Sequence, residues 1–128
     1  MSDYQPGVCN IGREERQKRR AAGAMGFLAA AGYVAFVLAS GWSDTALLGT
    51  FPLLFGGFVG LVQDRMGFCV AFGALARYDL SGSGGEEGRV ENADAVRHDR
   101  LKALQILAVS GAAAAVATVA VYAVGTTV

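Results

Sequence analysis

Three long stretches of the sequence carry no charged residue, and they constrain the fold more than any other feature. They cover residues 21–43, 45–63 and 103–128, which are 23, 19 and 26 residues long. A helix needs roughly 20 apolar residues to cross a hydrocarbon core about 30 Å thick. Only 17% of the 128 residues are charged, so too little polar chain remains to surround three such helices in water. The sequence therefore predicts an all-α integral membrane protein with three transmembrane helices.

The first uncharged stretch also permits a second interpretation, as a signal peptide. It follows a basic region, and it contains "VLAS" at residues 37–40, whose small residues are typical of a cleavage site. The apolar core of a signal peptide is only about 7–15 residues long, and this stretch is longer. We therefore expect a retained crossing.

The basic residues are concentrated in two parts of the chain. All eleven Lys and Arg residues lie either before the first uncharged stretch or between the second and the third. Basic residues next to crossings remain on the cytoplasmic side. We expect a multi-pass protein of the cell (inner or cytoplasmic) membrane, with the N-terminus in the cytoplasm, the C-terminus outside and Trp42 near the outer surface. The predicted organisation is one membrane domain, 1–128, with cytoplasmic segments 1–20 and 64–102 and crossings at about 21–43, 45–63 and 103–126.

The cytoplasmic segments contain further local signals. Residues 66–76 are apolar, but a helix of that length spans only about 16 Å at ~1.5 Å per residue, so we expect a short interfacial helix. Residues 80–96 are rich in Gly, Ser and acidic residues, which is typical of a flexible loop. Asn92 or Asp94 is suited to cap a helix that continues into the third crossing. A second helix is expected to start near Arg13 and to continue into the first crossing.

Small residues recur at helical spacing in all three crossings. Such residues let helix backbones approach closely in lipid, so we expect helix packing within the chain or between chains at Gly56, Gly60, Ala31, Ala35, Ser110 and Ala114. The alternative is that a composition rich in Gly and Ala produces these spacings by chance. No Asp, Glu, Lys, Arg or His lies inside a crossing, which argues against a proton-coupled transporter. Pro52 should kink the second crossing or reset its start.

The two cysteines, Cys9 and Cys69, are both predicted to lie on the cytoplasmic side. A structural disulfide is disfavoured there because the compartment is reducing. A metal site is not expected, because the chain has one histidine, His98, and no C-x-x-C motif. We therefore predict no metal and no cofactor. Cys9 and Cys69 form a candidate thiol site, and the alternative is that they are small interfacial residues without a chemical role.

The segment "CNIGREERQKRRAAG" at residues 9–23 resembles the opening of the YgaP-like small inner-membrane family. The matching positions are Asn10, Ile11, Gly12, Glu15, Arg16, Arg19 and Gly23. Residues 60–73 look like the closing segment of that family, with Cys69 at its cysteine, although Val70 replaces the proline that follows. The resemblance implies a two-crossing hairpin, to which this chain adds a third crossing. It associates the chain with sulfur chemistry because some family members are fused to a rhodanese.

The motif also has a physical interpretation of its own. Asn10 is suited to cap the basic helix, and Gly12 permits a tight turn before it. Glu15 and Arg19 are four residues apart and are expected to pair. The basic side chains of the motif can contact lipid phosphates.

No arrangement typical of an enzyme is present in the sequence, so we expect a non-catalytic protein. The preferred hypothesis is an accessory or scaffolding subunit, or a homo-oligomer, embedded in the lipid bilayer as part of a larger membrane assembly. One alternative is a cytoplasmic-face thiol protein that handles sulfur or metal through Cys9 and Cys69. Another is an oligomeric channel for a small solute. Nucleic-acid binding is not expected, because the basic N-terminal segment lacks interleaved aromatic residues.

Overall fold

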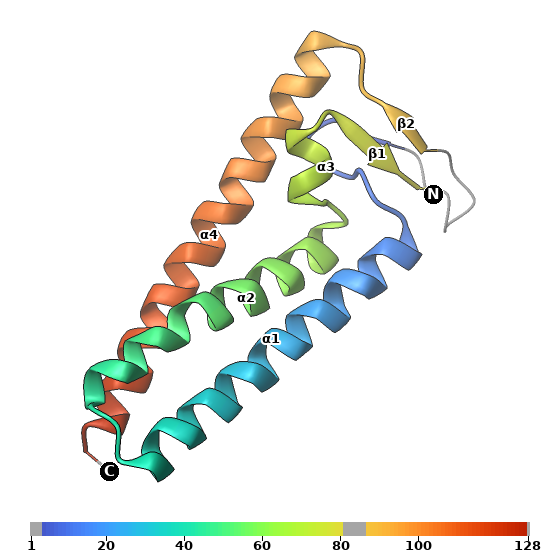
Figure 1. Ribbon diagram of the computed structural model, residues 1–128. Helices are drawn as coiled ribbons and strands as arrows, with labels where there is room; N and C mark the ends of the chain where they lie inside the picture. Colours follow the sequence, from blue (N-terminus) through green and yellow to red (C-terminus); the bar gives the residue numbers. More distant parts are fainter. Residues whose placement is uncertain (1–3, 81–86, 128) are drawn as a thin grey trace.

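The computed structural model describes residues 4–80 and 87–127, and over these ranges the chain consists mainly of three long helices with a small two-stranded sheet at one end (Figure 1). The elements follow in the order α1 (Arg13–Ser40), the 3-10 helix η1 (Asp44–Thr50), α2 (Phe51–Met66), α3 (Val70–Ala74), β1 (Arg77–Asp79), β2 (Glu87–Arg89) and α4 (Ala93–Gly125).

Three helical segments are long and apolar enough to cross a membrane. They are α1, the continuous segment Asp44–Met66 that joins η1 to α2, and α4. This result confirms three helices of the predicted length and apolar character at the predicted places, and it suggests a multi-pass membrane protein. Two of the helices extend beyond their uncharged stretches, because α1 begins at Arg13 and α4 begins at Ala93. A helix of 33 residues is about 50 Å long, so α4 exceeds the thickness of a hydrocarbon core.

Local sequence signals explain where these helices start and stop. Gly41 ends α1 with φ 68°, a left-handed conformation that glycine adopts without strain. Pro52 lies in the first turn of α2, so it resets the start of that helix after η1 instead of kinking it. The side chain of Asn92 accepts a hydrogen bond of 3.0 Å from the backbone N–H of Ala95, so Asn92 caps α4.

The sheet corrects the all-α expectation. β1 and β2 pair in antiparallel register, with Arg77 opposite Arg89. β2 and the start of α4 occupy part of the 80–96 segment that was expected to be a loop, whereas residues 81–86 lie outside the described residues. β1 also pairs with the N-terminal segment, because Asp79 N–H donates to the carbonyl of Asn10 over 2.8 Å. This partner is distant in sequence, which explains why the local pattern did not predict a strand.

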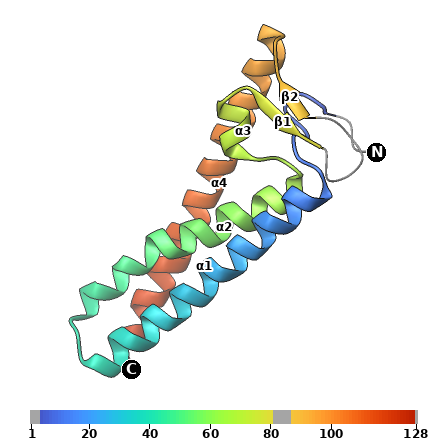
Figure 2. The same cartoon turned by 45° about the vertical axis from the view of Figure 1, so that its right-hand side comes forward.

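The expected interfacial helix over residues 66–76 is shorter in the structure. Only α3 is helical there, and it has 5 residues. The rest of that segment forms turns, because Gly67 has φ 63° and ends α2. Figure 2 shows α3 and the sheet on the same end of the molecule, beside the first turns of α4 and the start of α1.

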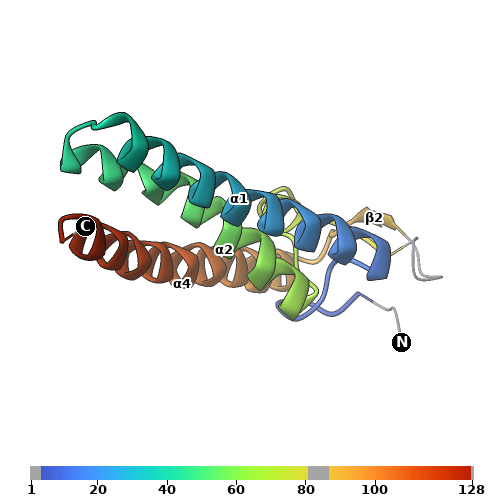
Figure 3. The ribbon, with the colours of Figure 1, turned by 90° about the horizontal axis from the view of Figure 1, so that it is seen from below.

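The contact between α1 and α2 is built from glycines. A Cβ atom added to Gly60 would lie 2.6 Å from the carbonyl oxygen of Arg19 and 2.7 Å from the Cα atom of Gly23. The two backbones therefore almost touch. Figure 3 shows α1 and α2 running alongside each other over most of their length, with α4 on the other side of α2.

The predicted packing residues divide between this contact and the outer faces of the bundle. Gly60 lies in the α1–α2 contact, whereas a Cβ atom on Gly56 would meet no atom within 4 Å. Ala31 and Ala35 are exposed on α1. The physical reason is that the glycines which meet across the α1–α2 contact lie on one face of each helix, whereas Ala31, Ala35 and Gly56 lie on other faces.

The contact between α2 and α4 uses larger side chains and two buried clusters. Towards the end that carries the C-terminus, Ala114 packs with Leu54 and Ala30. Towards the end that carries the sheet, Phe68 packs with Ala103 and Ile106. Ser110 lies between these clusters on α4, and Ser110 and Ala114 are both fully buried, as the small-residue spacing predicted.

Candidate functional site

The turn at residues 67–69, which follows α2, is where the predicted motif and both cysteines come together. The N-terminal segment before α1 lies across this turn, and the carbonyl of Gly67 accepts hydrogen bonds from the N–H groups of Asn10 and Ile11 over 3.1 and 3.3 Å. Phe68, at the centre of the turn, is fully buried against α4. We call this feature the 67–69 turn.

Asn10 fixes the backbone of Cys69 with both ends of its side-chain amide. Its Oδ1 accepts a hydrogen bond from Cys69 N–H over 2.6 Å, and its Nδ2 donates to the carbonyl of Cys69 over 3.1 Å. Asn10 is fully buried. The expectation that Asn10 caps α1 is therefore wrong: Gly12 occupies the N-cap position, without a side-chain hydrogen bond. The amide instead satisfies the N–H group of Cys69, which would otherwise be buried without a partner. It also adds a second hydrogen bond to the carbonyl of Cys69, which accepts from Gly73 N–H over 2.9 Å.

Arg19 brings a guanidinium group to the thiol of Cys69. Its Nη2 lies 3.1 Å from Cys69 Sγ, and another contact of 3.4 Å joins Nη2 to Glu15 Oε1. The predicted pairing of Glu15 with Arg19 is thus confirmed. The guanidinium also lies over the ring of Phe72, 5.8 Å from its centroid. These contacts hold the cation in one orientation beside a thiol that is itself 2% exposed.

Asp64 joins the same ends of α1 and α2, and the sequence analysis did not find it as a site residue. Its carbonyl accepts a hydrogen bond from Arg16 Nε over 2.7 Å. Its carboxylate lies 3.7 Å from Arg16 Nε and 3.3 Å from Arg20 Nε. The sequence feature that could have identified Asp64 as a site residue is its position, because it is the first acidic residue after an uncharged stretch of 19 residues.

Cys9 lies at the other side of the same turn. It is partly buried, its Sγ donates to the carbonyl of Ile11 over 3.4 Å, and a Cβ atom on Gly67 would be 3.6 Å from that sulfur. Both cysteines are free thiols. The structure therefore brings the two predicted thiols to one turn without bonding them. Among the described residues, no group of three or more His, Cys, Asp or Glu side chains could hold a metal ion.

A second polar cluster ties the N-terminal segment to α4 through Asp99. This residue is fully buried, and its carboxylate accepts hydrogen bonds from the hydroxyl of Tyr4 over 2.5 Å and from Gly7 N–H over 2.7 Å. Burial and the hydrogen bond to Asp99 raise the pKa of Tyr4 above its ordinary value. Sequence reasoning missed Asp99, because the charges around it resemble those of a solvated segment.

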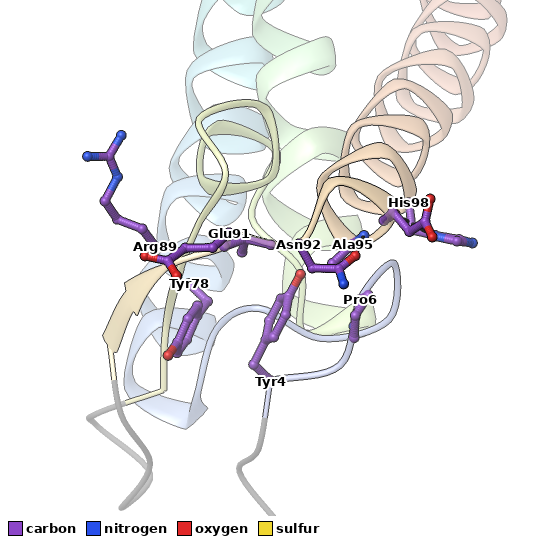
Figure 4. Close-up of a pocket in the computed structure, with 10 residues that line it drawn as sticks. Tyr4, Pro6, Tyr78, Arg89, Glu91, Asn92, Ala95 and His98 are labelled. Atoms are coloured by element: carbon purple, nitrogen blue, oxygen red, sulfur yellow. Dashed lines mark hydrogen bonds between the residues drawn. The ribbon is translucent and has the colours of Figure 1, made fainter.

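Next to this cluster is a hollow of about 600 Å³ (Figure 4). The rings of Tyr4 and Tyr78 stack there with centroids 4.9 Å apart. Figure 4 shows the side chains of Arg89 and His98 extending away from these rings. The groups that could select a charged ligand are therefore not directed at a common point. The other lining residues are Pro6, Val90, Glu91, Asn92, Asp94 and Ala95.

Comparison with known proteins identifies no relative for this chain. No protein-family model matches the sequence, and no curated protein or solved structure matches it significantly.

Proposed function

We propose that the chain is a small non-catalytic integral membrane protein that acts as an accessory or scaffolding subunit or as a homo-oligomer. One observation carries this proposal: the polar side chains of the N-terminal motif are used to hold the chain together. Asn10 fixes Cys69, Arg16 binds Asp64, and Arg19 bridges Glu15 and Cys69. A motif whose polar groups are used in this way stabilises the fold of the chain. The protein would then act by binding other subunits through its surfaces.

The proposed orientation places the 67–69 turn at the cytoplasmic side of the inner membrane. Support comes from the basic residues, which are confined to the termini of α1, α2 and α4 at that end and to the segments joined to them. In this arrangement α3 lies at the membrane interface, and the C-terminal end of α4 reaches the outside. A cysteine introduced at Thr127 should react with an impermeant thiol reagent in intact cells. Labelling that occurs only after permeabilisation would show that Thr127 lies in the cytoplasm, and it would contradict the proposed orientation.

An apolar groove within the membrane-spanning part is the proposed contact surface for a helix of another subunit. It has a volume of about 510 Å³ and is lined by Phe27, Ala30, Ala31, Val34, Ala35, Leu38, Thr50, Leu54 and Val121. Ala31 and Ala35, which were predicted to pack, therefore border a hollow and not the α1–α2 contact. Small residues at such a position let another helix approach closely.

The experiment fills the groove and measures assembly in native-membrane nanodiscs. Ala35→Leu should reduce the recovery of other subunits or of additional copies of the chain, as measured by native mass spectrometry. Ala29→Leu is a matched control, because Ala29 is exposed on the same helix and does not line the groove. Recovery of the wild-type protein as a single chain without any partner would contradict the subunit proposal.

The second candidate function is thiol chemistry on sulfur or metal through Cys9 and Cys69. The observation that favours it is the 3.1 Å contact between Arg19 Nη2 and Cys69 Sγ. A guanidinium beside a thiol stabilises negative charge on the sulfur. Protein purified from native membranes should then carry persulfide sulfur or metal that is lost in Cys69→Ser. Equal sulfur and metal content in the wild type and in the Cys9→Ser/Cys69→Ser variant would exclude this function.

A further inference from the structure

The part of α4 before its uncharged stretch carries an exposed groove of mixed chemistry. The groove has a volume of about 510 Å³ and is lined by Ala93, Val96, Arg97, Arg100, Leu101 and Leu104. Leu101 and Leu104 are 56% and 64% exposed, which is unusual for large apolar side chains beside two arginines in water. None of these described lining residues is acidic, so no carboxylate in the groove neutralises the two guanidinium groups.

The contacts between helices show where this groove lies relative to the membrane surface. The last charged residue of α4 before the uncharged stretch is Lys102. The next residue, Ala103, packs against Phe68, which lies two residues after the end of α2. At the same end of α2, Asp64 contacts Arg20, the last charged residue of α1 before its own uncharged stretch. The charged ends of all three helices therefore lie at one level.

The rise of an α-helix places the groove residues around that level. At ~1.5 Å per residue, the backbones of Arg100 and Arg97 lie about 3 and about 8 Å beyond Lys102. The headgroup layer on each side of a bilayer is about 5–7 Å thick. Arg100 therefore lies in the headgroup layer and Arg97 at its outer edge, within reach of a phosphate by its long side chain. Leu101 and Leu104 lie where the layer meets the acyl chains. Arg100 is held in place by a hydrogen bond of 3.4 Å from its Nε to the carbonyl of Ala74.

We propose that this groove binds an anionic phospholipid, with the headgroup phosphate between Arg97 and Arg100 and an acyl chain along Leu101 and Leu104. The inference rests on the membrane placement described above, and it does not depend on whether the protein is a subunit. Charge complementarity favours this occupant over an apolar helix, which would leave two cations without counter-charges. Each basic residue at a membrane surface changes the affinity for anionic lipid about fivefold, so two contribute about 30-fold.

The experiment titrates the full-length protein in neutral detergent with phosphatidylglycerol or phosphatidylcholine and counts bound lipids by native mass spectrometry. The wild type should bind phosphatidylglycerol about 30-fold more tightly than Arg97→Gln/Arg100→Gln, with little difference for phosphatidylcholine. Arg77→Gln/Arg89→Gln is the matched control, because it removes the same charge from two exposed arginines of the sheet. Arg97→Lys/Arg100→Lys should keep most of the preference, since the charge remains.

Several results would overturn the proposal. One is equal phosphatidylglycerol affinity in the wild type and Arg97→Gln/Arg100→Gln, while circular dichroism shows both to be folded. A second is competition by soluble glycerol phosphate at the same concentration, which would indicate a site for a free anion. A third is a change in the number of bound chains instead of bound lipids, which would make the groove a protein contact. Because the spectra count chains and lipids separately, failure of the subunit proposal is distinguishable from failure of this one.

Discussion

The helix α2 packs against α1 on one side and against α4 on the other, and the two contacts are built differently. On the α1 side, Gly23 and Gly60 bring the backbones into direct contact. On the α4 side, Phe68 and Ile106 fill the space between helices with side chains. In lipid the hydrophobic effect does not drive helices together, so close van der Waals contact has to do so. The α1–α2 contact therefore has no room for additional atoms. The α2–α4 contact can adjust to a substitution, because its side chains can change their packing.

The polar contacts at the end that carries the sheet follow the same division. α1 is joined to α2 and to the 67–69 turn by arginines and by the amide of Asn10. The N-terminal segment contacts α4 through other residues, because Tyr4 and Gly7 donate hydrogen bonds to Asp99. The N-terminal segment thus connects both sides of α2, so substitutions there and in the two helix contacts can separate their contributions.

The largest effect is expected from Gly60→Ala. The added methyl group would lie 2.6 Å from a carbonyl oxygen and 2.6 Å from a backbone nitrogen of α1. Backbone atoms cannot rotate away, so α1 and α2 must separate. Overpacking of a tight contact costs about 1–3 kcal/mol, and we expect a loss near the upper end of that range. The measurement is the free energy of unfolding in mixed detergent micelles, followed by circular dichroism.

Gly56→Ala is the matched control in the same helix. A Cβ atom there meets no atom within 4 Å, and alanine favours a helix by about 1 kcal/mol over glycine. The variant should therefore be as stable as the wild type or slightly more stable. If both variants unfold with the same free energy, direct backbone contact is not what holds α1 against α2.

A smaller but clear loss is expected from Asn10→Ala. The substitution leaves the buried N–H group of Cys69 unpaired, whereas its carbonyl keeps the hydrogen bond from Gly73 N–H. An unpaired buried polar group costs about 1–3 kcal/mol. We expect a loss of about 2 kcal/mol, measured in the same micelles, and faster reaction of Cys69 with a thiol reagent. Asn92→Ala provides the comparison, because it removes only the cap of α4 and should cost about 1 kcal/mol. An effect of Asn10→Ala below that of Asn92→Ala would mean that the 67–69 turn is held by other contacts.

These contacts also show how far the sequence could predict the structure. The uncharged stretches predicted the three long apolar helices, because a run of about 20 residues without charge is typical of a membrane-spanning helix. Helical spacing alone did not decide which small residues face a neighbour: Gly60 and Ser110 are buried, whereas Gly56 and Ala31 are exposed. Periodicity defines a stripe on a helix, but the partner that covers the stripe depends on the arrangement in space.

Some residues of the site were predictable from the sequence, but most of their contacts were not. The motif marked Asn10 and Arg19, and the pairing of Arg19 with Glu15 followed from helical spacing. The partner of Asn10 lies 59 residues away, so no local pattern could reveal it. Asp99 was missed for the same reason, because its partners Tyr4 and Gly7 come from the other end of the chain.

The smallest effect on stability is expected from Ser110→Ala. This substitution tests the contact between α2 and α4. Among residues 4–80 and 87–127, the hydroxyl of Ser110 is the only buried side-chain polar group without a hydrogen-bond partner. Removing an unpaired polar group from a buried contact should leave stability unchanged or raise it by up to about 1 kcal/mol. Thr118→Val is the matched variant on the same face of α4, because the hydroxyl of Thr118 donates to the carbonyl of Ala114 over 2.7 Å.

Side-chain hydrogen bonds between membrane helices contribute about 0.6 kcal/mol on average. The bond of Thr118 lies within α4, so we expect Thr118→Val to lose no more than about that amount. The order of stabilities, with Ser110→Ala above the wild type or equal to it and Thr118→Val below it, is the expected result in thermal unfolding. A larger loss for Ser110→Ala than for Thr118→Val would show that the hydroxyl of Ser110 has a partner in the membrane, such as a group on another subunit. The α4 side of α2 would then be an assembly contact as well as a core, and the division between its two sides would no longer hold.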